Sequence, residues 1–149
     1  MVGGTRLGCD VGTVRIGLAR CDPEGVLATA LPAVQAGPQA ITEVVRLVAD
    51  LQAVEVIVGL PLRLDGTVGP AAEQAQAWAA ELRKGLKDAG QVVQVHLRDE
   101  RLTTVQAQRG LHAAGRTTRS SRQRIDSASA VVLLQGYLDQ QRRNQTGGT

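Results

Sequence analysis

The strongest constraint on the fold comes from two apolar runs on either side of Asp10. Leu7 and Cys9 before it, and Ile16 and Leu18 after it, alternate with glycine or alanine at a period of two, which is typical of buried strands. The Gly-Thr pair between the runs predicts a turn, so the two strands form a hairpin. Asp10 ends the first strand. There it could bind a hard cation or face a phosphate, or it could accept hydrogen bonds from its own turn.

The rest of the chain predicts further strands and helices in alternation. Pro32 and Pro38 bound an expected linker before the first helix, which begins at Thr42 or an earlier residue as its cap. The predicted strands are 6–9, 15–21, 26–31, 54–58 and 92–97, and the predicted helices are 41–51, 70–89, 105–114 and 125–141. Because the fourth and fifth strands are reached through helical crossovers, we expect them to lie parallel to the first strand.

This order predicts an α/β, ribonuclease H-like domain with a mixed five-stranded sheet, three antiparallel strands and then two parallel ones, flanked by helices. The chain of 149 residues is long enough for one domain with a sizeable core. We therefore expect a single domain over residues 1–142 and a polar, disordered tail over 143–149.

Composition narrows the expected partners and compartment. The chain has no Phe, one Trp and one Tyr, which argues against single-strand readers that stack bases on aromatic rings. Cys9 and Cys21 form no C-x-x-C pair, so we expect reduced, partly buried thiols in a cytoplasmic protein. His96 and His112 are assigned no catalytic role. No apolar segment approaches the length of a membrane span, so no membrane contact is expected.

Positive charge is concentrated in one polar segment. The net charge is only +3, but four arginines fall close together: Arg116, Arg119, Arg122 and Arg124. The plain interpretation of this predicted loop is a solvated charge run. Beside an acidic site, the segment would instead attract the polyanionic substrate past the negative charges. The logarithm of the binding constant would then fall against the logarithm of the salt concentration with a slope near −0.9 for each phosphate contact.

Three carboxylates fall where the predicted topology makes the elements converge. Asp10 ends the first strand, Glu100 follows the fifth and Asp126 begins the last helix. Three carboxylates about 5 Å apart would repel by roughly 3 kcal/mol per pair at an effective dielectric of 20, so the cluster needs a cation or a shared proton. Oxygen ligands favour Mg²⁺ or Mn²⁺, and a phosphodiester is the natural substrate. Singly, Glu100 could pair with Arg101, and Asp126 could be a favourable charge at a helix start.

The chain resembles the YqgF/RuvX-like family, described as Holliday junction resolvases and as nucleases of the pre-16S rRNA 5′ end. The matching motifs are Asp10-Val-Gly-Thr-Val-Arg-Ile-Gly, Gly59-Leu-Pro-Leu-Arg-Leu-Asp-Gly-Thr, Asp99-Glu-Arg-Leu-Thr-Thr and Ile125-Asp-Ser-Ala-Ser-Ala-Val-Val-Leu-Leu-Gln-Gly-Tyr-Leu-Asp. They cover nearly the whole chain. The resemblance implies a ribonuclease H-like fold in which Asp10, Glu100 and Asp126 are the catalytic, metal-binding acids.

Two positions depart from the family pattern. Related resolvases often carry a further acid where this chain has Ser129. The implied site therefore rests on three acids, to which Asp99 could contribute another ligand. The resemblance does not decide between one and two metal ions. The family usually has a basic residue at Val14, which leaves Arg15 to make that phosphate contact. The candidate substrate-binding residues are Thr13, Arg15, Arg63, Arg101, Arg116, Arg119, Arg122 and Arg124. Arg101 could instead hold the neighbouring carboxylates in place.

Several functions remain compatible with this sequence. We rank processing of the pre-16S rRNA 5′ end first. Holliday junction resolution comes next, and it requires a homodimer because two symmetric strands must be cut. The Asp-x-Gly-Thr motif at Asp10 also occurs in sugar kinases and actin-like ATPases, but these need two such lobes and this chain has room for one. A nucleic-acid-binding module without catalysis is the third alternative.

Overall fold

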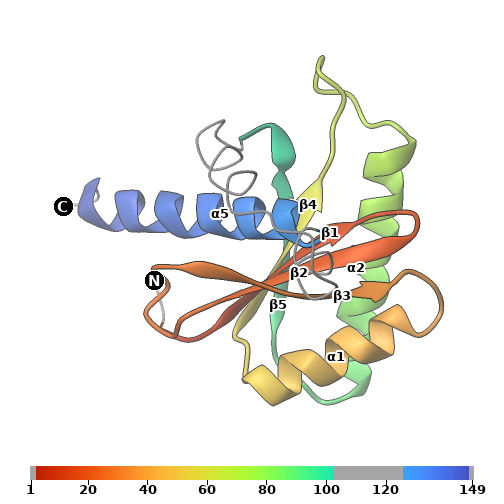
Figure 1. Cartoon of the computed structure of the whole chain (residues 1–149), viewed down its shortest axis with the longest axis horizontal. Helices are drawn as coiled ribbons and strands as arrows, with labels where there is room; N and C mark the ends of the chain where they lie inside the picture. Colours follow the sequence, from red (N-terminus) through yellow and green to blue (C-terminus); the bar gives the residue numbers. More distant parts are fainter. Residues whose placement is uncertain (1–2, 103–125, 148–149) are drawn as a thin grey trace.

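The computed structural model describes residues 3–102 and 126–147, which form a mixed sheet with helices on both faces (Figure 1). The strands are β1 (Arg6–Val11), β2 (Arg15–Cys21), β3 (Ala28–Gln35), β4 (Glu55–Leu60) and β5 (Gln94–Asp99). The helices are α1 (Ala40–Leu51), α2 (Pro70–Asp88), the short 3₁₀ helix η1 (Glu100–Leu102) and α5 (Ala128–Gly147).

The sheet has the order β3-β2-β1-β4-β5. The first three strands pair antiparallel, whereas β4 pairs parallel with β1 and β5 parallel with β4. The predicted ribonuclease H-like arrangement of three antiparallel and two parallel strands is confirmed. Its consequence for function is that β1, β4 and β5 end at the same edge of the sheet.

Two apolar cores lie on opposite faces of this sheet. Helices α1 and α2 cover one face and α5 crosses the other (Figure 1). Along β4, Val56 and Val58 belong to the first core and Ile57 to the second, because successive strand side chains point to opposite faces. This explains why the sequence of β4 is continuously apolar, as expected for a central strand covered on both sides.

The third strand differs from its prediction. We expected a strand over 26–31 followed by a linker from Pro32, but β3 runs from Ala28 to Gln35 and includes Pro32. β3 is an edge strand, and its pairing with β2 shifts in register where Ile16 opposes Val34 and Leu18 opposes Leu31. A proline fits there because an edge or bulge position does not require its missing N–H.

The bounds of two other elements also differ from the predicted ones. β5 covers 94–99 instead of 92–97, so Arg98 and Asp99 are strand residues paired with β4. α5 begins at Ala128, after the predicted start at Ile125, and continues to Gly147. Residues 143–147, predicted as part of a disordered tail, are therefore helical. The predicted helix over 105–114, with His112, lies outside the described residues.

The two cysteines are more buried than expected. Both are free and fully enclosed, and the Arg6 backbone N–H donates a hydrogen bond to Cys21 Sγ. Burial raises the pKa of the Cys9 thiol, which therefore stays protonated and acts as a small apolar side chain. Among the helices described, none is long and apolar enough to cross a membrane.

Candidate active site

The ends of β1 and β5 bring two of the three predicted acids together. Asp10 lies near the end of β1, and Glu100 directly follows β5 in η1. A hydrogen bond joins their side chains. Because a hydrogen bond between two carboxyl groups needs a proton, the pair holds one proton in common.

The environment of Glu100 explains where this proton resides. Burial, the hydrogen bond to Asp10 and the charges of Asp10 and Asp99 together raise the pKa of Glu100 to about 8. The Asp10 and Glu100 pair therefore keeps a proton at pH values where an isolated carboxyl group would be ionised. A buried carboxyl held neutral beside an acid is a common property of functional sites, and a bound cation would reverse it.

Gly59 makes room for this carboxyl on β4. A Cβ at this position would lie 2.2 Å from Glu100 Oε1, a distance no side chain could tolerate without displacing the carboxyl group. Sequence reasoning identified Gly59 as the end of the fourth strand and the first residue of a family motif, but did not predict that it lies beside Glu100. The sequence did contain a signal for this close approach, because Gly59 stands within a buried strand and not at a turn.

Asp126 lies in the turn before α5, next to the β1–β2 hairpin. Its Oδ2 is 3.3 Å from Arg15 Nη1, and both side chains are partly exposed. Within residues 3–102 and 126–147, no group of three or more His, Cys, Asp or Glu side chains is arranged to hold a metal ion. The structure thus joins Asp10 to Glu100 and pairs Asp126 with Arg15.

Ser127 fixes the start of α5 to the sheet. Its side chain is fully buried, and Oγ accepts a hydrogen bond from the Leu18 N–H at 3.0 Å and donates one to the Leu31 carbonyl at 2.6 Å. At Gly17, a Cβ would lie 2.6 Å from the Asp126 carbonyl oxygen. The serine hydroxyl therefore bridges β2 and β3 beside the register shift and sets the position of Asp126. Sequence reasoning missed Ser127, whose only signal is a polar residue preceding an apolar helix.

Arg101 forms its ion pair with Asp99, and not with Glu100 as the plain interpretation proposed. Arg101 Nη2 is 2.7 Å from Asp99 Oδ2, and Nε donates to both carboxylate oxygens. The Arg101 hydrogen bond is the main cause that lowers the pKa of Asp99. Arg101 Nη1 also donates to the Leu64 carbonyl at 3.3 Å, so this side chain ties η1 to the loop that follows β4.

Three of the remaining predicted residues lie at the turn after β1 and in the loop after β4. Thr13 and Arg15 are exposed at the β1–β2 turn, and Arg63 is exposed in the β4–α2 loop with its guanidinium against Gly69. The basic segment with Arg116, Arg119, Arg122 and Arg124 lies outside the described residues. His96 contacts Glu55 on β4 at 2.8 Å and takes no part in the acidic site.

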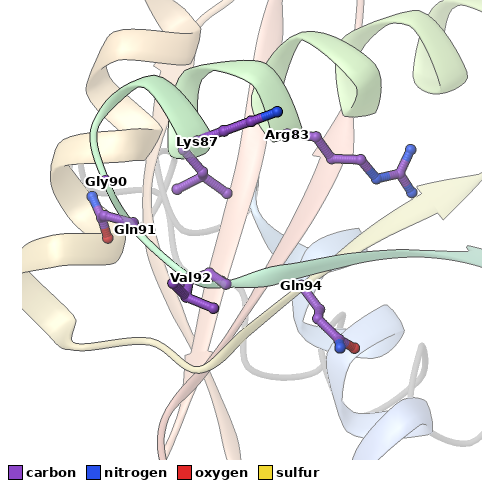
Figure 2. A pocket seen from close by; sticks show the side chains of 8 residues that line it. Arg83, Lys87, Gly90, Gln91, Val92 and Gln94 are labelled. Carbon is purple, nitrogen blue, oxygen red and sulfur yellow. The ribbon is translucent and has the colours of Figure 1, made fainter.

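A hollow of about 370 Å³ lies elsewhere, where α2 leads into β5 (Figure 2). It is lined by Arg83, Leu86, Lys87, Gly90, Gln91, Val92, Val93 and Gln94. Gln94 pairs with Glu55 at the beginning of β4, so the hollow lies at the opposite end of the parallel strands from Glu100. It contains no carboxylate and does not contribute to the candidate site.

The donor chemistry of the Asp10 and Glu100 pair fits a hard divalent cation. Both ligands are carboxylate oxygens, which suit Mg²⁺ or Mn²⁺ better than zinc. Their shared proton marks a position where negative charge needs compensation. Asp126 would complete the set only after separating from Arg15.

The sheet order and the covering helices define a protein of ribonuclease H-like fold, and solved structures agree. The Thermus thermophilus RuvC in complex with Holliday junction substrate aligns with a TM-score of 0.59 at 18% identity, over 93% of this chain and 96% of that chain. Fowlpox virus resolvase, solved with Holliday junction DNA, aligns with a TM-score of 0.55 at 11% identity, over 92% and 98% of the two chains.

Residues 4–140 match the family model described as RuvX: Holliday junction resolvase, and the chain belongs to this family of phosphodiester-cleaving hydrolases. A Nocardia farcinica relative is 47% identical over 145 residues, which cover 92% of this chain and 78% of the relative. A Mycobacterium ulcerans relative is 47% identical over 147 residues, covering 97% and 84%. Both relatives carry the name "Putative pre-16S rRNA nuclease".

Proposed function

We propose that this chain is a divalent-metal-dependent nuclease that processes the 5′ end of pre-16S rRNA during ribosome biogenesis in the cytoplasm. The observation that carries the proposal is the Asp10 and Glu100 pair, which the ends of β1 and β5 bring together across β4, with the pKa of Glu100 raised to about 8. The names of relatives that share 47% of their residues with this chain support the choice of substrate.

Asp10, Glu100 and Asp126 are the proposed ligands of Mg²⁺ or Mn²⁺. When bound, the cation supplies activation of water and neutralisation of charge at the scissile phosphate. Asp10 and Glu100 would hold the cation in their ionised form and would then no longer share a proton, because carboxylates ligate metal without their proton. Gly59 keeps space for the Glu100 carboxyl against β4, and Ser127 holds the backbone that carries Asp126.

Arg15 links substrate binding to this acidic set. Its guanidinium pairs with Asp126 at 3.3 Å in a partly exposed position, where a phosphate group can compete for it. A phosphate that takes Arg15 would release Asp126 toward the other two acids. The other proposed phosphate contacts are Thr13, Arg63, Arg101, Arg116, Arg119, Arg122 and Arg124.

Holliday junction resolution is the second candidate, because the matching family is described as a resolvase and a structural neighbour was solved with a junction. A resolvase cuts two symmetric strands and therefore needs two active sites, which this chain would supply as a homodimer. RNA processing places no such demand on the oligomeric state.

The test is cleavage of two labelled substrates, a pre-16S rRNA 5′-leader mimic and a four-way DNA junction, each with Mg²⁺ or Mn²⁺. We expect the wild type to cut the RNA, Asp10→Asn to abolish cutting, and Asp50→Asn to cut like wild type because Asp50 is exposed on α1. Cutting of the junction alone would favour the resolvase. Binding by both wild type and Asp10→Asn, without cutting under either metal, would identify a non-catalytic binding module.

A further inference from the structure

The β4–α2 loop, residues 61–69, places an apolar side chain in solvent close to the candidate active site. The loop projects beyond the end of β4, on the side of the sheet where β5 leads into η1 (Figure 1). Leu64 is 96% exposed, more than any other large apolar side chain described near this edge of the sheet. The Leu64 side chain is therefore fully available to a molecule that binds at this edge.

Internal hydrogen bonds make this loop a defined structure. The Arg63 N–H donates to the Thr67 carbonyl at 3.0 Å, and the Gly66 N–H donates to the Arg63 carbonyl at 2.8 Å. Asp65 Oδ1 accepts from both the backbone N–H and the hydroxyl of Thr67. Gly66 has a φ of +88°, a conformation that glycine adopts readily. Leu64 is therefore presented by a closed turn.

The turn is also attached to the active-site edge. Leu60, which precedes the loop, pairs with Asp99, and Asp99 is followed by Glu100. Arg101 Nη1 donates to the carbonyl of Leu64 itself. Arg101 thus holds the backbone of the residue that carries the exposed side chain, and Arg63, the preceding residue, is itself exposed in the same loop.

We propose that Leu64 is a wedge that inserts between neighbouring bases of the nucleic-acid substrate at the end of a helical segment, while Arg63 and Arg101 contact phosphates beside it. Proteins that bend or open nucleic acid insert leucine and similar apolar side chains between base steps in this way. Unstacking is easiest where pairing ends, so the wedge would select a junction between paired and unpaired nucleotides. The inference rests on the proposed function.

The experiment measures base stacking without cleavage. An RNA hairpin with a single-stranded 5′ extension carries 2-aminopurine at one position in turn across the helix end, and binding is measured in EDTA. Wild type is expected to raise the fluorescence at one of these positions. Leu64→Ala should lose that rise and bind about 10-fold more weakly, equivalent to about 1.4 kcal/mol, whereas Leu64→Met should restore both. Val92→Ala is the matched control, because Val92 is fully exposed in the loop before β5, away from the acids.

The result separates the wedge from the nuclease proposal. A Leu64→Ala protein that keeps both the fluorescence rise and the affinity overturns the wedge, even if wild type cuts the leader RNA and Asp10→Asn does not. Weaker binding with an unchanged fluorescence rise also overturns it, since Leu64 would then contact the substrate without parting bases. Failure of wild type to bind either the RNA hairpin or a DNA counterpart overturns both proposals.

Discussion

Replacing Ser127 by alanine is expected to lower the free energy of unfolding by about 2 to 6 kcal/mol. The change removes the acceptor of the Leu18 N–H and the donor to the Leu31 carbonyl, at 3.0 Å and 2.6 Å, from a fully buried position. An unsatisfied buried polar group costs about 1 to 3 kcal/mol, and two groups lose their partner here. Since each kcal/mol shifts the melting temperature of a domain this size by about 2 to 4 °C, the loss would be plain in a thermal scan.

Urea unfolding followed by circular dichroism would measure this loss at pH 7. Ser129→Ala is the matched control, because Ser129 is exposed on the first turn of the same helix, and it should stay within about 0.5 kcal/mol of wild type. If Ser127→Ala is as stable as Ser129→Ala, the serine bridge between β2 and β3 does not hold α5 in place. In that case Ser127 does not position Asp126 either.

Three further predictions concern the acids and the basic segment. Gly59→Ala should abolish cleavage of the leader RNA, because its Cβ would lie 2.2 Å from Glu100 Oε1, whereas Gly3→Ala, where the nearest atom is 3.9 Å away, should cut normally. Because folding raises the pKa of Glu100 from 4.5 to about 8, the folded chain binds more protons than the unfolded chain between these values, so stability falls as pH rises through this window. Urea unfolding in EDTA should show this fall in wild type and a smaller one in Glu100→Gln; equal slopes would contradict the shared proton. Joint replacement of the arginines of the basic segment by glutamine should lower the salt dependence of RNA binding by about 0.9 for each phosphate that is no longer neutralised, and an unchanged salt slope would dismiss that role. The replaced residues are Arg116, Arg119, Arg122 and Arg124.

The hydrophobic pattern predicted the sheet well and its boundaries less well. Alternating apolar residues around Asp10 and the apolar run of β4 identified central strands, because a buried strand must cover its faces. The prediction failed where a tertiary contact overrode a local signal. Pro32 looked like a strand end, yet an edge strand with a register shift accepts it.

The sequence predicted where the candidate site lies, at one edge of the sheet, better than it predicted the contacts between its side chains. Topology predicted that Asp10, Glu100 and Asp126 converge at one edge of the sheet. In the structure, Asp10 and Glu100 lie at the ends of β1 and β5, on either side of β4, and their side chains share a hydrogen bond. No local pattern in the sequence could show that Asp126 forms an ion pair with Arg15, or that Arg101 forms one with Asp99 and not with Glu100. Such choices depend on rotamers and on distances of a few ångströms.

By itself, the sequence determined the order of strands and helices and therefore the edge of the sheet at which Asp10 and Glu100 lie. Hydrophobic periodicity and the direction of helical crossovers are properties of the chain alone. Only the tertiary structure decided that Asp10 and Glu100 share a proton, that Gly59 leaves room for the Glu100 carboxyl, and that the Ser127 hydroxyl bonds to the backbone of β2 and β3. These outcomes arise from desolvation and close packing between residues far apart in the chain, as between Leu18 and Ser127, and such effects exist only once the chain has folded.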